Sequence, residues 1–197
     1  MPSIKIADSI LKNIQGAPQM SPLSKAIVIA ATAHDGQIDK GGHPYIFHLL
    51  RVMMEQETDE SRIVGVLHDL FEDCDWTQDD LRRHGFSEEI IAAVESVTRR
   101  QQETYKEFIK KAASNPIGRK VKLADLRDNC DLERLPHASD IDYQRVEKYQ
   151  RAITFIEDLF DEKCLSSSDC HARSSLARSP VVQAEYTPNK NSETLQT

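Results

Sequence analysis

The sequence contains no run of about 18 apolar residues, the length that a membrane-spanning helix requires, so no membrane span is expected. Its start mixes charged residues with isoleucines and lacks the continuous apolar stretch of a signal peptide. Cysteine is scarce: Cys74, Cys130, Cys164 and Cys170 show no pairing framework. These absences together predict a protein of the reducing cytoplasm.

Basic residues are outnumbered in this chain of 197 residues. Lys and Arg total 25, Asp and Glu total 32, and the net charge is -7. This balance argues against a general nucleic-acid surface. It is compatible with a small anionic substrate, because a local basic pocket or a metal can hold phosphate. The sequence leaves the oligomeric state open, a homo-oligomer included.

Alternation typical of strands is also lacking, and the apolar spacing is helical almost throughout. Beyond about residue 162 the chain becomes rich in serine and loses its apolar period. We therefore predict an all-α bundle over residues 1–161, followed by a disordered tail over residues 162–197. Helices are expected from about residue 22, around residues 47–53, over 59–74, from 77 and 87, and over 105–113, 115–135 and 139–161.

The segment over residues 66–73 carries the strongest chemical signal. The pair His68-Asp69 lies in an apolar run, and Glu72-Asp73 follows one turn later. On a continuous helix, residues three and four apart share a face, so these side chains would form one polar stripe. Burying such a cluster unpaired costs several kcal/mol or more. A bound cation would remove that cost, so the stripe predicts a metal site.

Two distant segments supply further candidate ligands. His34 ends an apolar helix, and Asp125 lies on an otherwise apolar turn. Two imidazoles and two carboxylates suit a borderline divalent ion such as Mn, Fe, Co or Zn. Such an ion lowers the pKa of water, and Glu72 or Asp73 could take the proton. The reaction class that follows is hydrolysis of a phosphate ester or anhydride.

Each of these residues also has a simpler explanation when taken alone. A histidine at a helix end is often a C-terminal cap, and Asp125 could pair with Lys122 or Arg127. A Glu-Asp pair is often a solvated helix end. His48 is expected to order the loop and helix start around it rather than to bind metal. The order and flanks of the residues together favour the metal site.

The ordered pattern of His34, His68-Asp69 and Asp125 resembles the signature of HD-domain phosphohydrolases. The flanking residues are similar to the hydrolase domain of the Rel/SpoT stringent-response family over about residues 22–160. The similar segments are 33–37, 42–48, 67–73, 97–98 and 121–129. The resemblance implies one bound Mn ion and removal of the 3′-pyrophosphate from guanosine tetra- and pentaphosphate. We expect no synthetase domain to follow, as in the small stand-alone alarmone hydrolases that the chain resembles.

The resemblance also implies a role for each matching residue. His34, His68, Asp69 and Asp125 match the metal ligands, and Glu72 and Asp73 match the pair that activates and positions water. Lys40, Asn129, Arg145 and Tyr149 match nucleotide contacts. Lys148 shares a helical face with Arg145 and Tyr149 and adds a second cation for phosphate oxygens.

The chain departs from the family's pattern around the expected nucleoside pocket. Asp39 stands before Lys40 where the family usually has an arginine that stacks on guanine. Leu126 and Leu132 also replace the residues usual at their positions. Asp39 could accept hydrogen bonds from an amino group of adenine or guanine. Two alternatives therefore stay open: another nucleotide as substrate, such as an adenosine alarmone or a nucleoside monophosphate, and a non-catalytic nucleotide-binding regulator.

Overall fold

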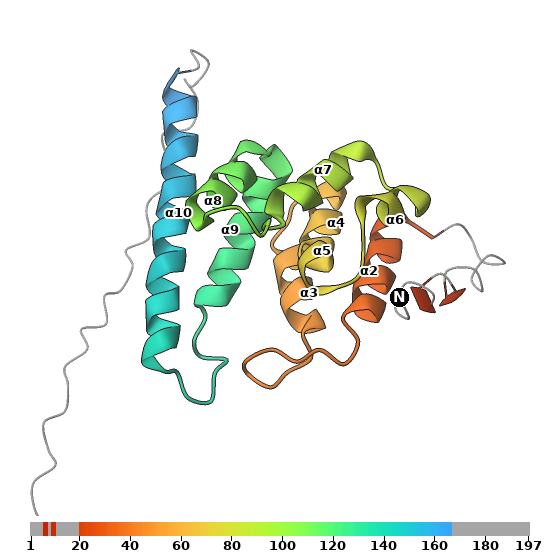
Figure 1. The fold of residues 1–197 in the computed structure, drawn as a ribbon. Coiled ribbons are helices and arrows are strands. Elements are labelled where there is room, and N and C mark those ends of the chain that lie inside the picture. The colour runs from red at the N-terminus through yellow and green to blue at the C-terminus, as the bar shows by residue number, and fades with distance from the viewer. Residues whose placement is uncertain (1–5, 8, 11–19, 167–197) are drawn as a thin grey trace, which may run out of the picture.

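The computed structural model describes residues 6–7, 9–10 and 20–166, and it confirms the all-α class predicted from the apolar spacing (Figure 1). Within these residues no β strand forms, and the only extended pairing is an isolated bridge between Ile38 and Pro44. The helices are α2 (Pro22–Ala33), α3 (Ile46–Met54), α4 (Asp59–Leu67), α5 (Leu70–Asp73), α6 (Gln78–Arg83), α7 (Glu88–Val97), α8 (Tyr105–Ser114), α9 (Pro116–Cys130) and α10 (Asp140–Ser166).

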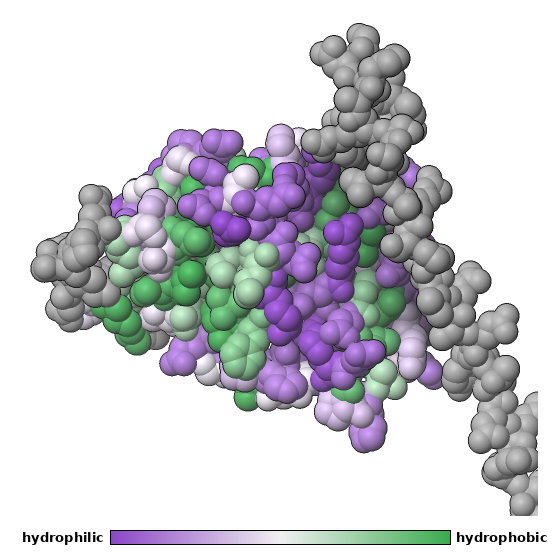
Figure 2. All heavy atoms as spheres, turned by 180° about the vertical axis from the view of Figure 1, so that it is seen from behind, coloured by the Kyte–Doolittle hydropathy of each residue, from purple (hydrophilic) through white to green (hydrophobic). Residues whose placement is uncertain are grey.

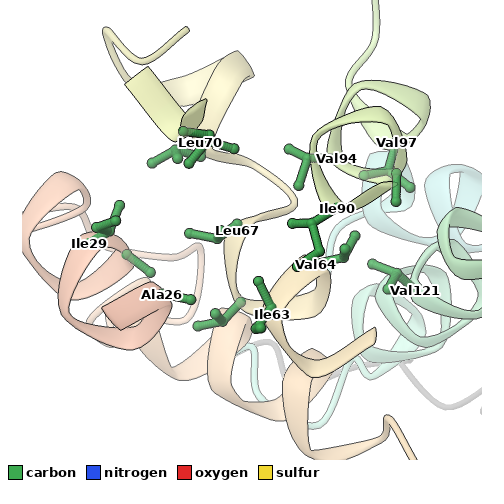
Figure 3. Packing of buried hydrophobic residues seen from close by; sticks show 14 of the residues in the cluster. Ala26, Ile29, Ile63, Val64, Leu67, Leu70, Ile90, Val94, Val97 and Val121 are labelled. Carbon is green, nitrogen blue, oxygen red and sulfur yellow. The ribbon is translucent and has the colours of Figure 1, made fainter. Parts of the chain in front are cut away.

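Helix α4 is the centre of the larger core. It contacts α2, α3, α7 and α9, and most of its residues are buried. In Figure 3, Val64 of α4 lies among Ile90 and Val94 of α7 and Val121 of α9. This packing holds the end of α4, where the His68-Asp69 pair follows, inside the bundle.

A second, smaller core joins α8, α9 and α10. Phe108 and Ile109 of α8 pack with Leu126 of α9 and with Ile153 and Ile156 of α10. Figure 1 shows α10 as the long helix beside α8 and α9. Helix α9 contributes to both cores, so it fixes residues 125–129 between them.

Helix starts follow the capping signals in the sequence. Thr77 accepts from the amide of Asp80, and the Asp80 carboxylate accepts from the amide of Thr77, which forms a capping box where a helix was predicted to start. Ser87 caps α7 in the predicted position. Each such cap satisfies backbone amides that a helix start leaves unpaired.

The prediction of one helix over residues 59–74 is wrong, because the helix breaks at the His68-Asp69 pair. Asp69 has φ -97° and ψ 2°, outside helical values. A continuous helix would pair the Gly65 carbonyl with the Asp69 amide, but the His68 ring lies 2.8 Å from that carbonyl and Asp69 accepts from Tyr45. The predicted stripe of stacked side chains is therefore replaced by a turn between α4 and α5.

The helical boundaries near the C-terminus also differ from the predicted ones. Helix α9 ends at Cys130 rather than near residue 135, and α10 runs to Ser166, past the predicted core boundary at residue 161. The rest of the predicted tail, residues 167–197, lies outside the described residues. No helix in the described part of the chain is long and apolar enough to cross a membrane.

Apolar side chains also reach the surface. The face turned away from the viewer of Figure 1 shows hydrophobic patches beside a broad band of hydrophilic side chains (Figure 2). The large apolar side chains exposed among the described residues 20–159 include Ile38, Phe47, Met54, Ile141 and Tyr143. Single exposed apolar residues of this kind are common on globular proteins.

Gly65 lets α3 and α4 approach closely. A Cβ at this position would lie 3.0 Å from the Met53 Cα, a backbone atom that cannot rotate away. We expect Gly65→Ala to destabilise the fold by about 1–3 kcal/mol, although alanine is the better helix former. Thermal unfolding measures this change in stability. The control is Gly118→Ala in a Ser96→Ala background. A Cβ on Gly118 would clash with the Ser96 hydroxyl, a side-chain group that the second substitution removes. An unchanged or raised melting temperature for Gly65→Ala would contradict this account of the helix contact.

Candidate metal centre and adjoining pockets

Three buried side chains from separate helical segments meet inside the bundle. His48 of α3, His68 at the end of α4 and Asp125 of α9 each offer a ligand atom, and these atoms lie within 4.8 Å of one another. Nε2 of His48 is 3.3 Å from Oδ1 of Asp125, and Nε2 of His68 is 3.7 Å from the same oxygen. Imidazole nitrogens facing a carboxylate form a donor set suited to a divalent metal.

His68 is the residue that most clearly needs a cation. Its Nδ1 lies 2.8 Å from the Gly65 carbonyl, which assigns the ring proton to Nδ1 and leaves a lone pair on Nε2. Nε2 lies 3.0 Å from Oδ2 of Asp69, yet it is buried and has no hydrogen-bond partner. A metal-binding histidine typically donates its other N–H to a carbonyl or carboxylate. The residues present therefore fit a divalent ion.

His48 has the same arrangement. Its Nδ1 lies 2.7 Å from Oδ2 of Asp128, so Nε2 is free to face Asp125. Arg51 and Arg134 also contact the Asp128 carboxylate. The hydrogen bond with His48, followed by these arginine contacts, holds the pKa of Asp128 well below its usual range despite burial. The sequence-based expectation gave His48 only an ordering role, whereas the structure places it in the cluster.

The two aspartates of the centre are held in the ionised form. Burial alone would raise their pKa values, but the interaction with the neighbouring His68 ring lowers the pKa of Asp69 to about 2. Lys122, whose Nζ lies 2.6 Å from Oδ2 of Asp125, lowers the pKa of Asp125 well below its usual range. Asn129 donates to the other Asp125 oxygen at 2.6 Å. Both carboxylates thus remain negative and oriented toward the imidazoles.

His34 lies beside this cluster rather than in it. Its ring is buried, with Nδ1 2.8 Å from Oε1 of Gln37 and Nε2 3.6 Å from Sγ of Cys74. The Tyr45 ring contacts both His34 and His48, at centroid distances of 5.5 and 5.4 Å. The structure thus brings His68, Asp69 and Asp125 together among the predicted ligands, with His34 across the Tyr45 ring.

A polar pocket of about 300 Å³ opens beside Asp69 and Asp125. Glu72 and Asp73 line one wall of it, and Glu72 accepts from the backbone amide of Arg99. Removal from water is the largest cause that raises the pKa of both Glu72 and Asp73. A carboxylate with a raised pKa is a better proton acceptor, which suits the predicted role of this pair.

The same pocket has a cationic wall. Arg99, Lys122 and Lys148 line it together with Tyr105 and Tyr149. Desolvation, together with repulsion from Arg99 and Lys122, lowers the pKa of Lys148, so these cations are close enough to affect one another. Neither Arg99 nor Lys122 was predicted to belong to the site, since single basic residues are usually solvated or paired.

A second pocket, of about 270 Å³, adjoins the first on the side of the glycine-containing loop. Lys40 and Arg145 line it, and both pair with Asp142 at the start of α10. Tyr45 and Asn129 line both pockets. The predicted nucleotide contacts are therefore divided: Lys40 and Arg145 face the second pocket, Lys148 and Tyr149 face the first, and Asn129 faces both.

An all-helical bundle that buries a His-Asp centre between two polar pockets is the arrangement expected from the resemblance of the sequence to HD-domain phosphohydrolases. Comparisons with known proteins agree. A guanosine-3′,5′-bis(diphosphate) 3′-pyrophosphohydrolase of Vibrio cholerae is 34% identical over 115 residues, and its counterpart in Aquifex aeolicus is 30% identical over 139 residues. A GTP pyrophosphokinase of Myxococcus xanthus is 32% identical over 147 residues. These matches confirm the resemblance to Rel/SpoT hydrolase domains.

These matches cover more than half of this chain but only a small part of each relative. They cover 56%, 64% and 66% of this chain for Vibrio, Aquifex and Myxococcus, but only 16%, 20% and 19% of the relatives. A solved structure described as a metazoan ortholog of SpoT that hydrolyzes ppGpp shares the fold, with a TM-score of 0.55 and 20% identity. That match covers 75% of this chain and 98% of the solved chain. No family model matches the chain.

Proposed function

We propose that the chain is a metal-dependent pyrophosphohydrolase that removes the 3′-pyrophosphate from guanosine tetra- and pentaphosphate. The observation that carries this proposal is the unpartnered Nε2 of His68, which faces two carboxylates beside a pocket with an acidic and a cationic wall. The printed names of the Vibrio and Aquifex relatives support the substrate.

His48, His68, Asp69 and Asp125 are the proposed metal ligands, because they meet in one buried cluster, and His34, which the resemblance implies as a ligand, stays a further candidate beside it. Mn²⁺ is the proposed ion, because the resemblance to Rel/SpoT hydrolase domains implies it, and the imidazole and carboxylate ligands are compatible with it. A divalent ion in this place supplies Lewis-acid chemistry, acidifying water and neutralising phosphate oxygens.

The remaining steps belong to side chains of the first pocket. Glu72 takes a proton from the attacking water, and Asp73 accepts a hydrogen bond that aims it. Water attacks the phosphorus attached to the ribose 3′ oxygen, and the bond between that phosphorus and the 3′ oxygen breaks. The 3′ oxygen takes a proton from solvent, and pyrophosphate leaves beside Lys122 and Lys148. These cations offset the negative charge that develops on the phosphate oxygens.

The second pocket is proposed to hold the rest of the nucleotide. Lys40 and Arg145 face its 5′ phosphates, and Asn129 and Tyr149 contact the nucleotide where the two pockets meet. We further propose that residues 1–161 form the functional unit, that residues 162–197 are a separate tail, and that the protein works in the cytoplasm on a small nucleotide. Neither nucleic acid nor membrane is a proposed partner.

A nucleotide panel assayed with Mn²⁺ tests the proposal. We expect the purified full chain to release pyrophosphate from guanosine tetraphosphate and to lose this activity when a chelator removes the ion. Release of orthophosphate alone, or turnover of nucleoside monophosphates only, would point to a different phosphohydrolase. Binding of guanosine tetraphosphate with Mn²⁺ present but without product would overturn the enzymatic proposal in favour of a nucleotide-binding regulator.

A further inference from the structure

The second pocket combines an apolar wall with a fixed guanidinium group. Ile38, Leu132 and Leu135 supply apolar surface, and Arg134 lines the cavity among them. A flat, weakly polar group fits such a wall better than a phosphate does. Lys40 and Arg145, which suit phosphate, lie in the same pocket beside Asp142.

Acidic groups surround the edge of the Arg134 guanidinium, although its buried Nε forms no hydrogen bond. Its Nη2 donates to the Asp128 carbonyl and lies 3.1 Å from Oδ2 of the same residue. Nη1 lies 3.6 Å from Oδ2 of Asp39, and Nε lies 3.4 Å from Oδ2 of Asp131. Partners at the nitrogens engage the edge of the planar guanidinium and leave its faces for stacking. With 24% of the side chain exposed, part of the group is accessible from the pocket.

Backbone packing fixes the position of Arg134 as well. A Cβ on Gly41 would lie 2.6 Å from the Arg134 carbonyl oxygen, so only glycine lets the two loops approach this closely. Asp39, in the same loop as Gly41, accepts from the His43 amide at 2.9 Å through Oδ1. Its Oδ2 is buried without a hydrogen-bond partner and faces Arg134. The negative charge of Asp39 thus faces the guanidinium and helps to position it.

We propose that Arg134 is the residue that binds the nucleobase, by stacking its guanidinium face on the ring, with Asp39 as the positioning residue. This inference rests on the proposed function, because it assumes that the second pocket receives the nucleoside end of the substrate. Stacking reads the face of a base, which every base has, and does not read its edge. The chain therefore accepts guanine and adenine with affinities within about tenfold of each other.

Binding measurements without turnover test the role of Arg134. GDP, ADP and inorganic pyrophosphate are titrated into the wild-type chain and into Arg134→Lys, which keeps the charge and removes the planar group. Loss of base stacking is expected to weaken GDP and ADP by roughly 10- to 100-fold. Pyrophosphate affinity should stay unchanged. The matched control is Arg127→Lys, because Arg127 pairs with Glu157 and lines neither pocket.

Several results would overturn this assignment. Wild-type GDP affinity in Arg134→Lys would exclude stacking, and an equal loss for GDP and pyrophosphate would indicate a purely electrostatic or structural role. More than tenfold discrimination between GDP and ADP by the wild type would contradict recognition through the ring face. Asp39→Asn should weaken GDP by less than Arg134→Lys does, and a larger loss would contradict its positioning role.

The design also covers a variant that fails to fold. Circular dichroism reports folding, and if Arg134→Lys is unfolded, the exposed wall residue Ile38 replaces it as Ile38→Ala. That variant should weaken GDP several-fold and leave pyrophosphate binding unchanged, and unchanged GDP binding would overturn the base pocket. A wild type that binds GDP through Arg134 but releases no pyrophosphate from guanosine tetraphosphate would refute the proposed function alone.

Discussion

Alanine at His68 is expected to lower the affinity of the chain for Mn²⁺ by at least ~100-fold and to abolish pyrophosphate release. The side chain is buried, its Nδ1 faces the Gly65 carbonyl, and its Nε2 faces Asp69 and Asp125 without a hydrogen bond. Loss of a group that only orients a ligand costs about 10- to 100-fold in metal affinity, so loss of a ligand costs at least as much. Calorimetric titration of Mn²⁺ into the metal-free protein measures the change.

His34→Ala and His48→Ala rank the two remaining histidines in the same titration. Both rings have Nδ1 occupied, by Gln37 and by Asp128, whereas Nε2 of His34 faces Cys74 Sγ and Nε2 of His48 faces Asp125. We expect each substitution to weaken Mn²⁺ by at least ~10-fold. His137→Ala, at an exposed loop residue, is the control and should bind as the wild type does. A variant with wild-type affinity at His34 or His48 would remove that residue from the ligand set.

Folding must be separated from metal loss in these variants, because His68 is fully enclosed. The melting temperature is measured with and without Mn²⁺. An ion that binds only the folded state raises the melting temperature of the wild type, and this rise should vanish in His68→Ala. If His68→Ala keeps the full rise, His68 is not a ligand, whatever its activity.

Glutamine at Glu72 is expected to lower kcat by at least ~100-fold while Mn²⁺ affinity stays within a few-fold of the wild type. A positioned general base contributes about 10²- to 10⁴-fold, and glutamine keeps the shape of the side chain without its basicity. The Glu72 carboxylate accepts from the Arg99 amide, which holds it at the pocket wall. Glu95→Gln is the control, because Glu95 pairs with Arg100 and lines neither pocket. A kcat near the wild-type value would exclude Glu72 as the base.

The pH dependence of Glu72→Gln sharpens this result. Desolvation, the largest cause, raises the pKa of Glu72 above its ordinary value, and a general base acts only when deprotonated. Wild-type kcat should therefore fall as the pH drops through a pKa higher than that of a free glutamate. The residual rate of Glu72→Gln should lack this acidic limb. An identical limb in both proteins would assign the titration to another group.

Local signals made the fold class and many helix starts predictable. Helical apolar spacing and the Thr77 and Ser87 caps act within a few residues, so they can be read along the chain. The break after Leu67 could not be predicted in this way, because it accompanies a contact between Asp69 and Tyr45, 24 residues away. Tertiary contacts of this kind override local helical preference.

Part of the candidate site could be predicted, because a few polar residues stand out within apolar segments of the sequence. His68 and Asp125 were found because burying them without partners is costly. His48 was missed because its role depends on Asp128, which lies 80 residues further along the chain. Arg99 and Lys122 were missed for a similar reason: their place in the pocket follows from how α7, α8 and α9 pack.

Tyr45 and Asn129 line both pockets, so the two pockets adjoin. A ligand must extend from one pocket into the other to contact the residues of both. A ligand confined to one pocket meets either the acidic and cationic walls beside the metal centre or the apolar wall beside Arg134. Under the proposed function, a nucleotide with phosphates at both ends of its ribose would meet both sets of contacts at once. A nucleoside 5′-monophosphate would lack the contacts in the first pocket, so we expect it to bind more weakly whichever base it carries.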